Sequence, residues 1–155
     1  MSTEFPSLDE LLAEEASLRL DTSRFELFDF ADHCVQSMKA ENLPLSMIIR
    51  LHGRTVYQVA LPGSQPIHDM WMLRKARVAE LWGHSSLFVR LEHEATGRPY
   101  ESHGLNLEEF AFFGGGYPLV DAQQRTFGAI GISGTYQLPE HRLLVRLLGE
   151  YKSQY

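Results

Sequence analysis

The sequence predicts an α+β domain in which helices pack on a mainly antiparallel sheet, and three observations support this class. Two stretches of alternating apolar residues, 45–61 and 117–132, each contain a turn, as β-hairpins do. Segments with helical apolar spacing precede, separate and follow these stretches. The 155 residues are 44% apolar and 22% charged, which is typical of a globular domain. Helices gathered on two hairpins give a layered α+β architecture.

The first half of the chain is expected to form two helices, a hairpin and a long helix. Ser7 and Glu10 have the spacing of a capping box, and Asp29 is the expected cap of the second helix. Pro66 suits the first turn of the long helix, and Gly83 suits its end. The expected elements are helices at about 7–18, 29–42 and 66–82 and strands at 45–51 and 55–61.

The second half is expected to form further helices around a second hairpin. Residues 85–95 fit a helix capped by Ser85 or Ser86, although their apolar residues also alternate as in a strand, and a helix is favoured. Asn106 is expected to cap a short helix that ends at the glycines 114–116. Strands follow at 117–120 and 126–132, and Pro139 begins the last helix.

The chain is expected to be a single domain, 1–155, with an acidic helical extension at 1–21 ahead of a core at 22–155. Six acidic residues precede position 22, against Arg19 alone. The extension is interpreted as a solvated amphipathic helix, or as a segment that packs between subunits or against a protein partner. The formal charge of −6 and the lack of a basic cluster argue against nucleic-acid binding.

Cys34 is the single cysteine, so the chain cannot form an internal disulfide. It shares a helical face with apolar neighbours and is expected to be a buried, inert small hydrophobe. A reducing compartment fits this cysteine usage. With no secretory signal and no apolar run long enough to span a membrane, the expected location is cytoplasmic, without a membrane partner.

Arg74 and Lys75 are the most unusual residues of the long helix, because they fall within its apolar stripe. An unpaired buried charge is costly, so both cations need a partner or a solvent-filled site. One interpretation is an anion site for a carboxylate beside the flat face of Trp71. The other is a structural ion pair or an oligomer contact.

Glycines and histidines supply further candidates. The glycines 114–116 could present N–H groups to a ligand, with Gly114 and Gly115 as the candidate residues. Alternatively, they simply end a helix in a tight turn. None of the seven histidines belongs to an HExxH zinc motif. His93, between two glutamates, is expected to be solvated. No Gly-x-Ser-x-Gly elbow supports a serine hydrolase.

Four sequence segments, in order along residues 25–150, resemble segments of the GlcG/HbpS-like (haem-degrading domain) family. They are the first hairpin at 45–60, RKARVA at 74–79, GGGYPL at 114–119 and FGAIGISG at 127–134. The finer match is to one branch of this family, through Trp71, Arg74, Lys75, the pair Ser85 and Ser86, and the step Glu140-His141. The Gln-Asp-Glu segment of other members is absent, which puts any activity that depends on it in doubt.

The resemblance implies a profilin-like fold, a symmetric homo-oligomer and haem as a possible cofactor. It points to His33 as a possible haem ligand, whereas the sequence alone favours an exposed helical histidine at this position. Taken together, the residue patterns and the resemblance suggest as ligand-binding residues Trp71, Arg74, Lys75, Ser85, Ser86, Gly114 and Gly115. Fold similarity alone does not determine function.

Three functions therefore stay open. The first is a haem or related small-ligand binding domain, in which haem degradation would reflect the redox chemistry of bound haem. The second is a non-enzymatic oligomeric protein-interaction module. The third is an enzyme acting on a small carboxylated metabolite held by Arg74 and Lys75; no nucleophile or base is evident for it.

Overall fold

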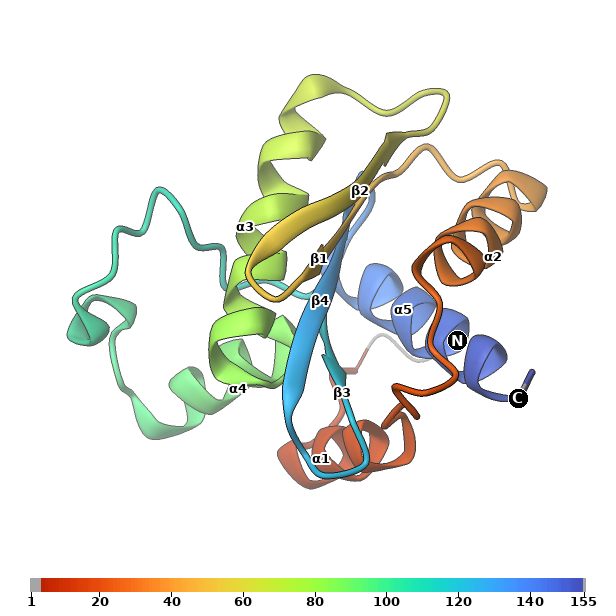
Figure 1. Cartoon of the computed structure of the whole chain (residues 1–155). Coiled ribbons are helices and arrows are strands. Elements are labelled where there is room, and N and C mark those ends of the chain that lie inside the picture. The colour runs from red at the N-terminus through yellow and green to blue at the C-terminus, as the bar shows by residue number, and fades with distance from the viewer. Residues whose placement is uncertain (1–3, 155) are drawn as a thin grey trace.

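A four-stranded antiparallel sheet lies between two layers of helices in the computed structural model, which describes residues 4–154 (Figure 1). The strands are β1 (Ser46–Leu51), β2 (Arg54–Ala60), β3 (Gly116–Val120) and β4 (Thr126–Ser133). The α-helices are α1 (Leu8–Ser17), α2 (Leu27–Ala40), α3 (Pro66–Trp82), α4 (Ser86–Thr96) and α5 (Gln137–Lys152). The predicted α+β class with two hairpins is confirmed.

The sheet has the order β2-β1-β4-β3, so the two hairpins join through β1 and β4. Alternation along β1 divides its side chains between the two faces. Met47 and Ile49 pack with α2 and α5, whereas Ile48 packs with Met72 and Ala76 of α3. Figure 1 shows α3 and α4 on one side of the sheet and α2 and α5 on the other.

Helix α3 lies very close to the sheet, and glycines make this approach possible. A Cβ at Gly131 would lie 2.2 Å from the carbonyl oxygen of Met72, and a Cβ at Gly116 would lie 2.2 Å from that of Lys75. Neither distance is compatible with a side chain. The glycines of β3 and β4 therefore determine how deeply α3 sits, and with it the position of Lys75.

The helix ends confirm some expected signals and correct others. Ser7 forms the predicted capping box with Glu10, and Gly83 ends α3 in the left-handed conformation. Asp29 does not cap α2: Glu26 is the cap, and its carboxylate accepts a hydrogen bond of 2.7 Å from the Asp29 N–H. The cap at Asp29 was wrong because the helix begins two residues earlier, at Leu27, so Asp29 lies in the first turn and its own N–H is one of the free groups that need a cap.

Residues 85–96 settle as helix α4, capped by Ser85, but the short helix expected from Asn106 is absent. Asn106 instead accepts a hydrogen bond from the N–H of Glu108 and makes a turn. Arg74 and Arg90 donate to the carbonyls of Leu107 and Phe112 and hold this loop against α3 and α4. These two arginines hold the segment in an irregular path against the neighbouring helices.

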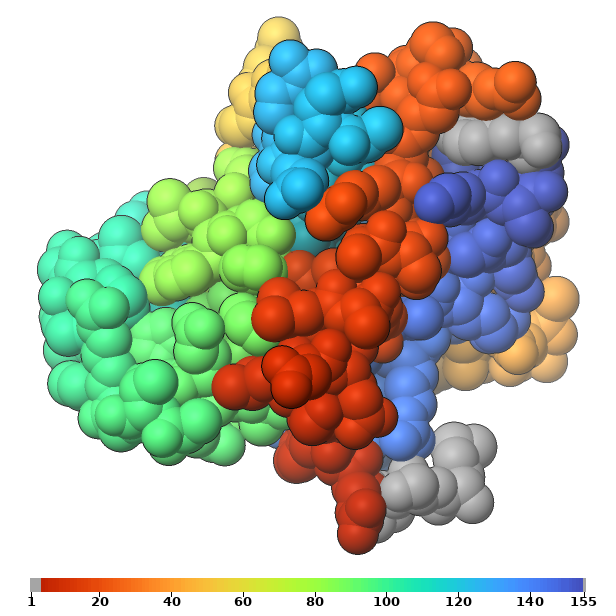
Figure 2. Space-filling model, turned by 90° about the horizontal axis from the view of Figure 1, so that it is seen from below, coloured from red at the N-terminus to blue at the C-terminus, as the bar shows by residue number. Residues whose placement is uncertain are grey.

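The acidic extension folds back on its own chain through α1. Leu11 is fully buried with Leu87 and Phe88 of α4 and Leu138 of α5. Figure 2 shows the described N-terminal residues, in red, lying between the α4 region and α5. Residues 1–3 of the predicted extension and residue 155 lie outside the described residues. Within the described part of the chain, no helix is long and apolar enough to cross a membrane.

Candidate functional site

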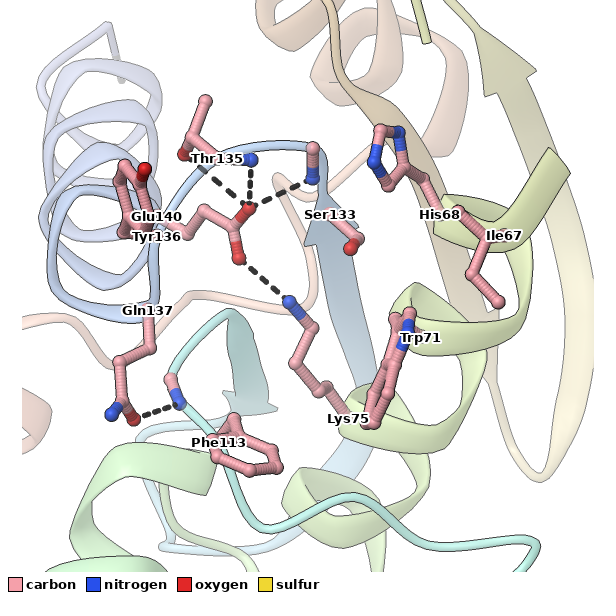
Figure 3. Close-up of a pocket in the computed structure, with 12 residues that line it drawn as sticks. Ile67, His68, Trp71, Lys75, Phe113, Ser133, Thr135, Tyr136, Gln137 and Glu140 are labelled. Carbon is pink, nitrogen blue, oxygen red and sulfur yellow. Dashed lines mark hydrogen bonds and ion pairs between the residues drawn. The ribbon is translucent and has the colours of Figure 1, made fainter. Parts of the chain in front are cut away.

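A cavity of about 450 Å³ opens between the first turns of α3 and α5 and the loop before β3 (Figure 3). This volume is within the range of small-molecule sites. The residues that line it are Ile67, His68, Trp71, Lys75, Phe113, Gly114, Ser133, Gly134, Thr135, Tyr136, Gln137 and Glu140.

A buried ion pair between Lys75 and Glu140 lies in the wall of the cavity. The Lys75 Nζ is 2.6 Å from the Glu140 Oε1, and the side chains are only 5% and 2% exposed. Burial lowers the pKa of Lys75 from its ordinary value, although the charge of Glu140 and its hydrogen bond act in the opposite direction. The pair satisfies the requirement that a cation in the apolar stripe of α3 must have a partner.

Backbone N–H groups hold the other oxygen of Glu140. The Oε2 atom accepts hydrogen bonds from the N–H groups of Gly134 and Thr135 at 2.9 and 2.7 Å. Gly134 has a φ of +148°, which glycine adopts readily, and this turn from β4 into α5 directs both N–H groups at the carboxylate. The carboxylate is therefore held on one side by the chain and on the other by Lys75.

Gly115 leaves room for the ion pair. A Cβ at this position would lie 2.6 Å from the Lys75 Nζ and 2.9 Å from the Glu140 Oε1. Its φ of +123° is also one that residues with side chains rarely adopt. The absence of a side chain at Gly115 thus allows the ion pair to form, and Gly115 is not itself among the lining residues.

Aromatic side chains form much of the remaining wall. The rings of Trp71 and Phe113 meet edge to face, with centroids 5.8 Å apart. Tyr136 is 81% exposed. The Gln137 side chain accepts a hydrogen bond from the N–H of Gly114, which ties the loop before β3 to α5. The cavity therefore combines apolar, flat surfaces with one charged pair (Figure 3).

The structure brings together only part of the set of residues that the sequence suggests. Trp71, Lys75 and Gly114 line the cavity. Arg74 lies over the Trp71 ring, 4.7 Å from its centroid, and donates to the Leu107 carbonyl instead of lining the cavity.

The two serines and His33 take other positions. Ser85 caps α4, and Ser86 donates to the Phe113 carbonyl and accepts from the Gly116 N–H, so it holds the loop that carries Phe113. His33 lies on α2, where its Nε2 is 3.2 Å from Glu150 of α5. It is not among the lining residues.

Sequence patterns do not identify Phe113, Tyr136 or His68 as cavity residues, and Glu140 enters only through the family resemblance. The role of Glu140 comes from its pairing with Lys75, which is 65 residues away in the chain, so no local pattern predicts this pairing. One local sign was available: Glu140 lies in the first turn of α5, just after a glycine turn, where free N–H groups attract carboxylates.

A second polar cluster joins α1 to the core. Glu14 accepts hydrogen bonds from the Tyr117 hydroxyl at 3.1 Å and contacts the His141 Nε2 at 2.9 Å. Burial and the charge of Glu14 raise the pKa of Tyr117 far above its ordinary value. Two of the acidic residues expected to be solvated, Glu14 and Glu15, thus face histidines and a tyrosine of the core.

His93 is buried, so its expected solvation is wrong. Successive helical residues point to different faces, and the flanking glutamates do not report on the face of His93. Its Nδ1 lies 2.7 Å from the Val89 carbonyl, and its Nε2 lies 2.7 Å from the His103 Nε2. Among the described residues no group of three or more histidine, cysteine or acidic side chains could hold a metal ion.

Known proteins resemble this chain in sequence and in fold. A family model described as "Haem degrading protein HbpS-like" matches residues 26–148, which leaves α1 outside the match. A UPF0303 protein of Streptomyces coelicolor is 33% identical over 150 residues, covering 94% of each chain.

Two solved structures show the same fold at low identity. The crystal structure of the Ybr137w protein has a TM-score of 0.82 at 24% identity and covers 98% of this chain and 91% of that one. A PduOC:haem complex has a TM-score of 0.63 at 20% identity and covers 79% of this chain and 89% of that one. With its family match over most of its length, the chain belongs to the HbpS-like family.

Proposed function

We propose that the chain binds haem or a related small planar ligand in the cavity beside Lys75 and Glu140. The observation that carries this proposal is the cavity of about 450 Å³ with Trp71 and Phe113 in its wall. Flat aromatic surfaces suit a planar apolar ligand, and a few polar groups can orient it. Membership of the HbpS-like family and a similar fold in a haem complex support haem as the ligand.

The cavity contains a residue that can bind haem iron. Histidine is a common axial ligand, and His68 lines this cavity. Its Nδ1 accepts a hydrogen bond of 3.1 Å from the Gln65 N–H, which leaves the proton of the neutral ring on Nε2. Iron binding through Nε2 would move that proton to Nδ1 and break this bond, at a cost of about 1 kcal/mol. This cost is small, so His68 can serve as the ligand, and His33 on α2 is the alternative ligand.

A haem titration followed by the Soret band tests the proposal. The variants His68→Ala and His33→Ala form a matched pair, because each removes one half-buried histidine. Saturable one-to-one binding that is lost in His68→Ala and kept in His33→Ala supports the cavity site. Loss in His33→Ala alone would move the site to α2 and α5. No saturable binding by the wild-type protein would overturn the proposal.

A homo-oligomer is a second candidate role, favoured by apolar side chains on the outside of the site. Met70 is 54% exposed and Tyr136 is 81% exposed, and Ile67 and Phe113 are exposed as well. Exposed apolar residues that gather on one region are typical of protein contacts. Light scattering on Met70→Glu tests this role. A smaller assembly than that of the wild-type protein supports it, and an unchanged mass contradicts it.

No observation favours an enzyme that holds a carboxylated metabolite between Arg74 and Lys75. Arg74 is already engaged by the Trp71 ring and the Leu107 carbonyl. Lys75 is already engaged by Glu140. A carboxylate clamp would have to compete with Glu140 for Lys75, and Arg74 does not line the cavity.

A further inference from the structure

Lys75 differs from the other lysines of the chain in its surroundings. The sequence contains three lysines, at positions 39, 75 and 152. Lys39 is exposed, and Lys152 lies at the end of α5, where it donates to the Ser17 carbonyl. Lys75 is buried and lines the cavity. Among the described residues, a small molecule that enters the cavity therefore meets one primary amine.

The Lys75 ammonium group has unused hydrogen-bonding capacity. An ammonium group has three N–H donors. In the part of the chain that the structure describes, one hydrogen bond is formed, to the Glu140 Oε1. A buried amine with so few acceptors is stabilised less in its charged form than an amine in water, and burial lowers the pKa of Lys75 accordingly.

Glu140 is placed to exchange a proton with this amine. Its Oε1 is 2.6 Å from the Lys75 Nζ, within the range needed for proton transfer. The N–H groups of Gly134 and Thr135 hold its Oε2, so the carboxylate keeps its position while Oε1 accepts and returns a proton. A lysine that loses its proton in an apolar site becomes a nucleophile for carbonyl carbon.

The walls of the cavity indicate which carbonyl compounds fit. Trp71 and Phe113 supply aromatic surface, their rings meeting edge to face. Arg74 and Arg90 lie over these rings and do not line the cavity. Such walls favour a planar, uncharged aldehyde over a highly charged one.

We propose that Lys75 forms a reversible imine with a small planar aldehyde that enters this cavity. The inference rests on the proposed function only in requiring that the cavity admits small ligands, and it does not require haem.

The step is balanced without an oxidant or a reductant. The Lys75 ammonium passes one proton to Glu140, and the freed Nζ electron pair forms a bond to the carbonyl carbon. The carbonyl oxygen takes up that proton and a second one from the nitrogen and leaves as water when the C–O bond breaks. The product is a protonated imine on Lys75, so the charge of the site is unchanged, and water reverses the reaction.

Trapping with benzaldehyde and sodium cyanoborohydride tests the inference on the full chain. The reductant converts an imine into a stable secondary amine, and peptide mass mapping then locates it. Lys75 is expected to be labelled at least about tenfold faster than Lys39 and Lys152, with a rate that saturates as the aldehyde concentration rises. The Lys39→Arg/Lys152→Arg variant keeps Lys75 and the cavity and should be labelled at the same rate.

Several outcomes would overturn the inference. One is labelling of Lys75 no faster than that of the two other lysines, and another is a rate that increases linearly with aldehyde concentration. A third is labelling that appears only when circular dichroism shows unfolding. The haem titration of the same preparation separates the proposals. A Soret shift without labelling of Lys75 would contradict only the imine proposal. Labelling of Lys75 without a Soret shift would contradict only the haem proposal.

Discussion

The carboxylate of Glu15 on α1 lies 2.7 Å from Nδ1 of His84, in the turn between α3 and α4. This contact connects the acidic extension to the turn that joins α3 and α4. It belongs to the same interface as the buried contacts of Leu11. The docking of α1 therefore depends on both apolar burial and the charge of a histidine.

The pKa of His84 should be higher than that of an ordinary histidine. The hydrogen bond that the His84 ring donates to the Glu15 carboxylate raises this pKa, and burial opposes the effect. Because the folded value is raised, the stabilisation is fully present below the unfolded pKa of about 6.5 and is lost as the pH rises through the folded value. Histidine titration by NMR should show the raised pKa, and Glu15→Gln should return it towards 6.5.

The control for this prediction is Asp9→Asn, which removes an exposed carboxylate from the same helix. Its His84 pKa should match that of the wild-type protein. Limited proteolysis should cleave α1 faster at about pH 8.5 than at about pH 5.5 in the wild-type protein, with a smaller difference in Glu15→Gln. An unchanged His84 pKa in Glu15→Gln would contradict the prediction.

Breaking the Lys75–Glu140 pair from one side should be costly. Lys75→Met leaves a buried carboxylate without its cation and should lower the free energy of unfolding by about 3–5 kcal/mol. Adding Glu140→Gln removes the charge and keeps an oxygen for the N–H groups of Gly134 and Thr135. The double variant should be more stable than Lys75→Met. Urea unfolding of the two single variants and the double variant measures the coupling, and additive losses would show that the pair does not interact.

Gly131 should not tolerate a side chain, because α3 passes directly over it. Gly131→Ala places a Cβ 2.2 Å from the Met72 carbonyl and should destabilise the protein by at least about 2 kcal/mol. Gly149→Ala, in α5, is the matched control, since its nearest neighbour would be at an ordinary 3.8 Å. That change should increase stability by roughly 0.5–1 kcal/mol, because alanine favours helix. Equal effects of the two changes on thermal unfolding would refute this account of helix packing.

Cys34 should not react in the folded protein. It is fully buried, and burial, with a smaller effect from Glu150, raises the pKa of its thiol to about 12. Since the thiolate is the reactive form, an aromatic disulfide reagent should modify Cys34 only as fast as the protein unfolds. Stopped-flow measurements in increasing urea should show the rate following the unfolding rate. Rapid modification without denaturant would show that the thiol is accessible.

Local pattern was sufficient for most of the secondary structure. Helices and strands have different apolar periods, and caps, prolines and glycines mark where they end, so α1, α3 and both hairpins follow from nearby residues. The loop at residues 104–115 shows the limit of this reasoning. Its helix-like start at Asn106 forms a turn instead, and Arg74 and Arg90 of other elements bind its carbonyls.

The sequence by itself determined the α+β class, the buried cysteine and the need for Lys75 to find a partner, because each follows from composition, periodicity or the cost of a buried charge. Only the tertiary structure decided that the partner is Glu140, and that Trp71 and Phe113 share a cavity wall while Arg74 and His33 lie elsewhere. These relationships join residues far apart in the chain. They depend on the order of the strands and on how closely α3 approaches the glycines of the sheet, which no local pattern encodes.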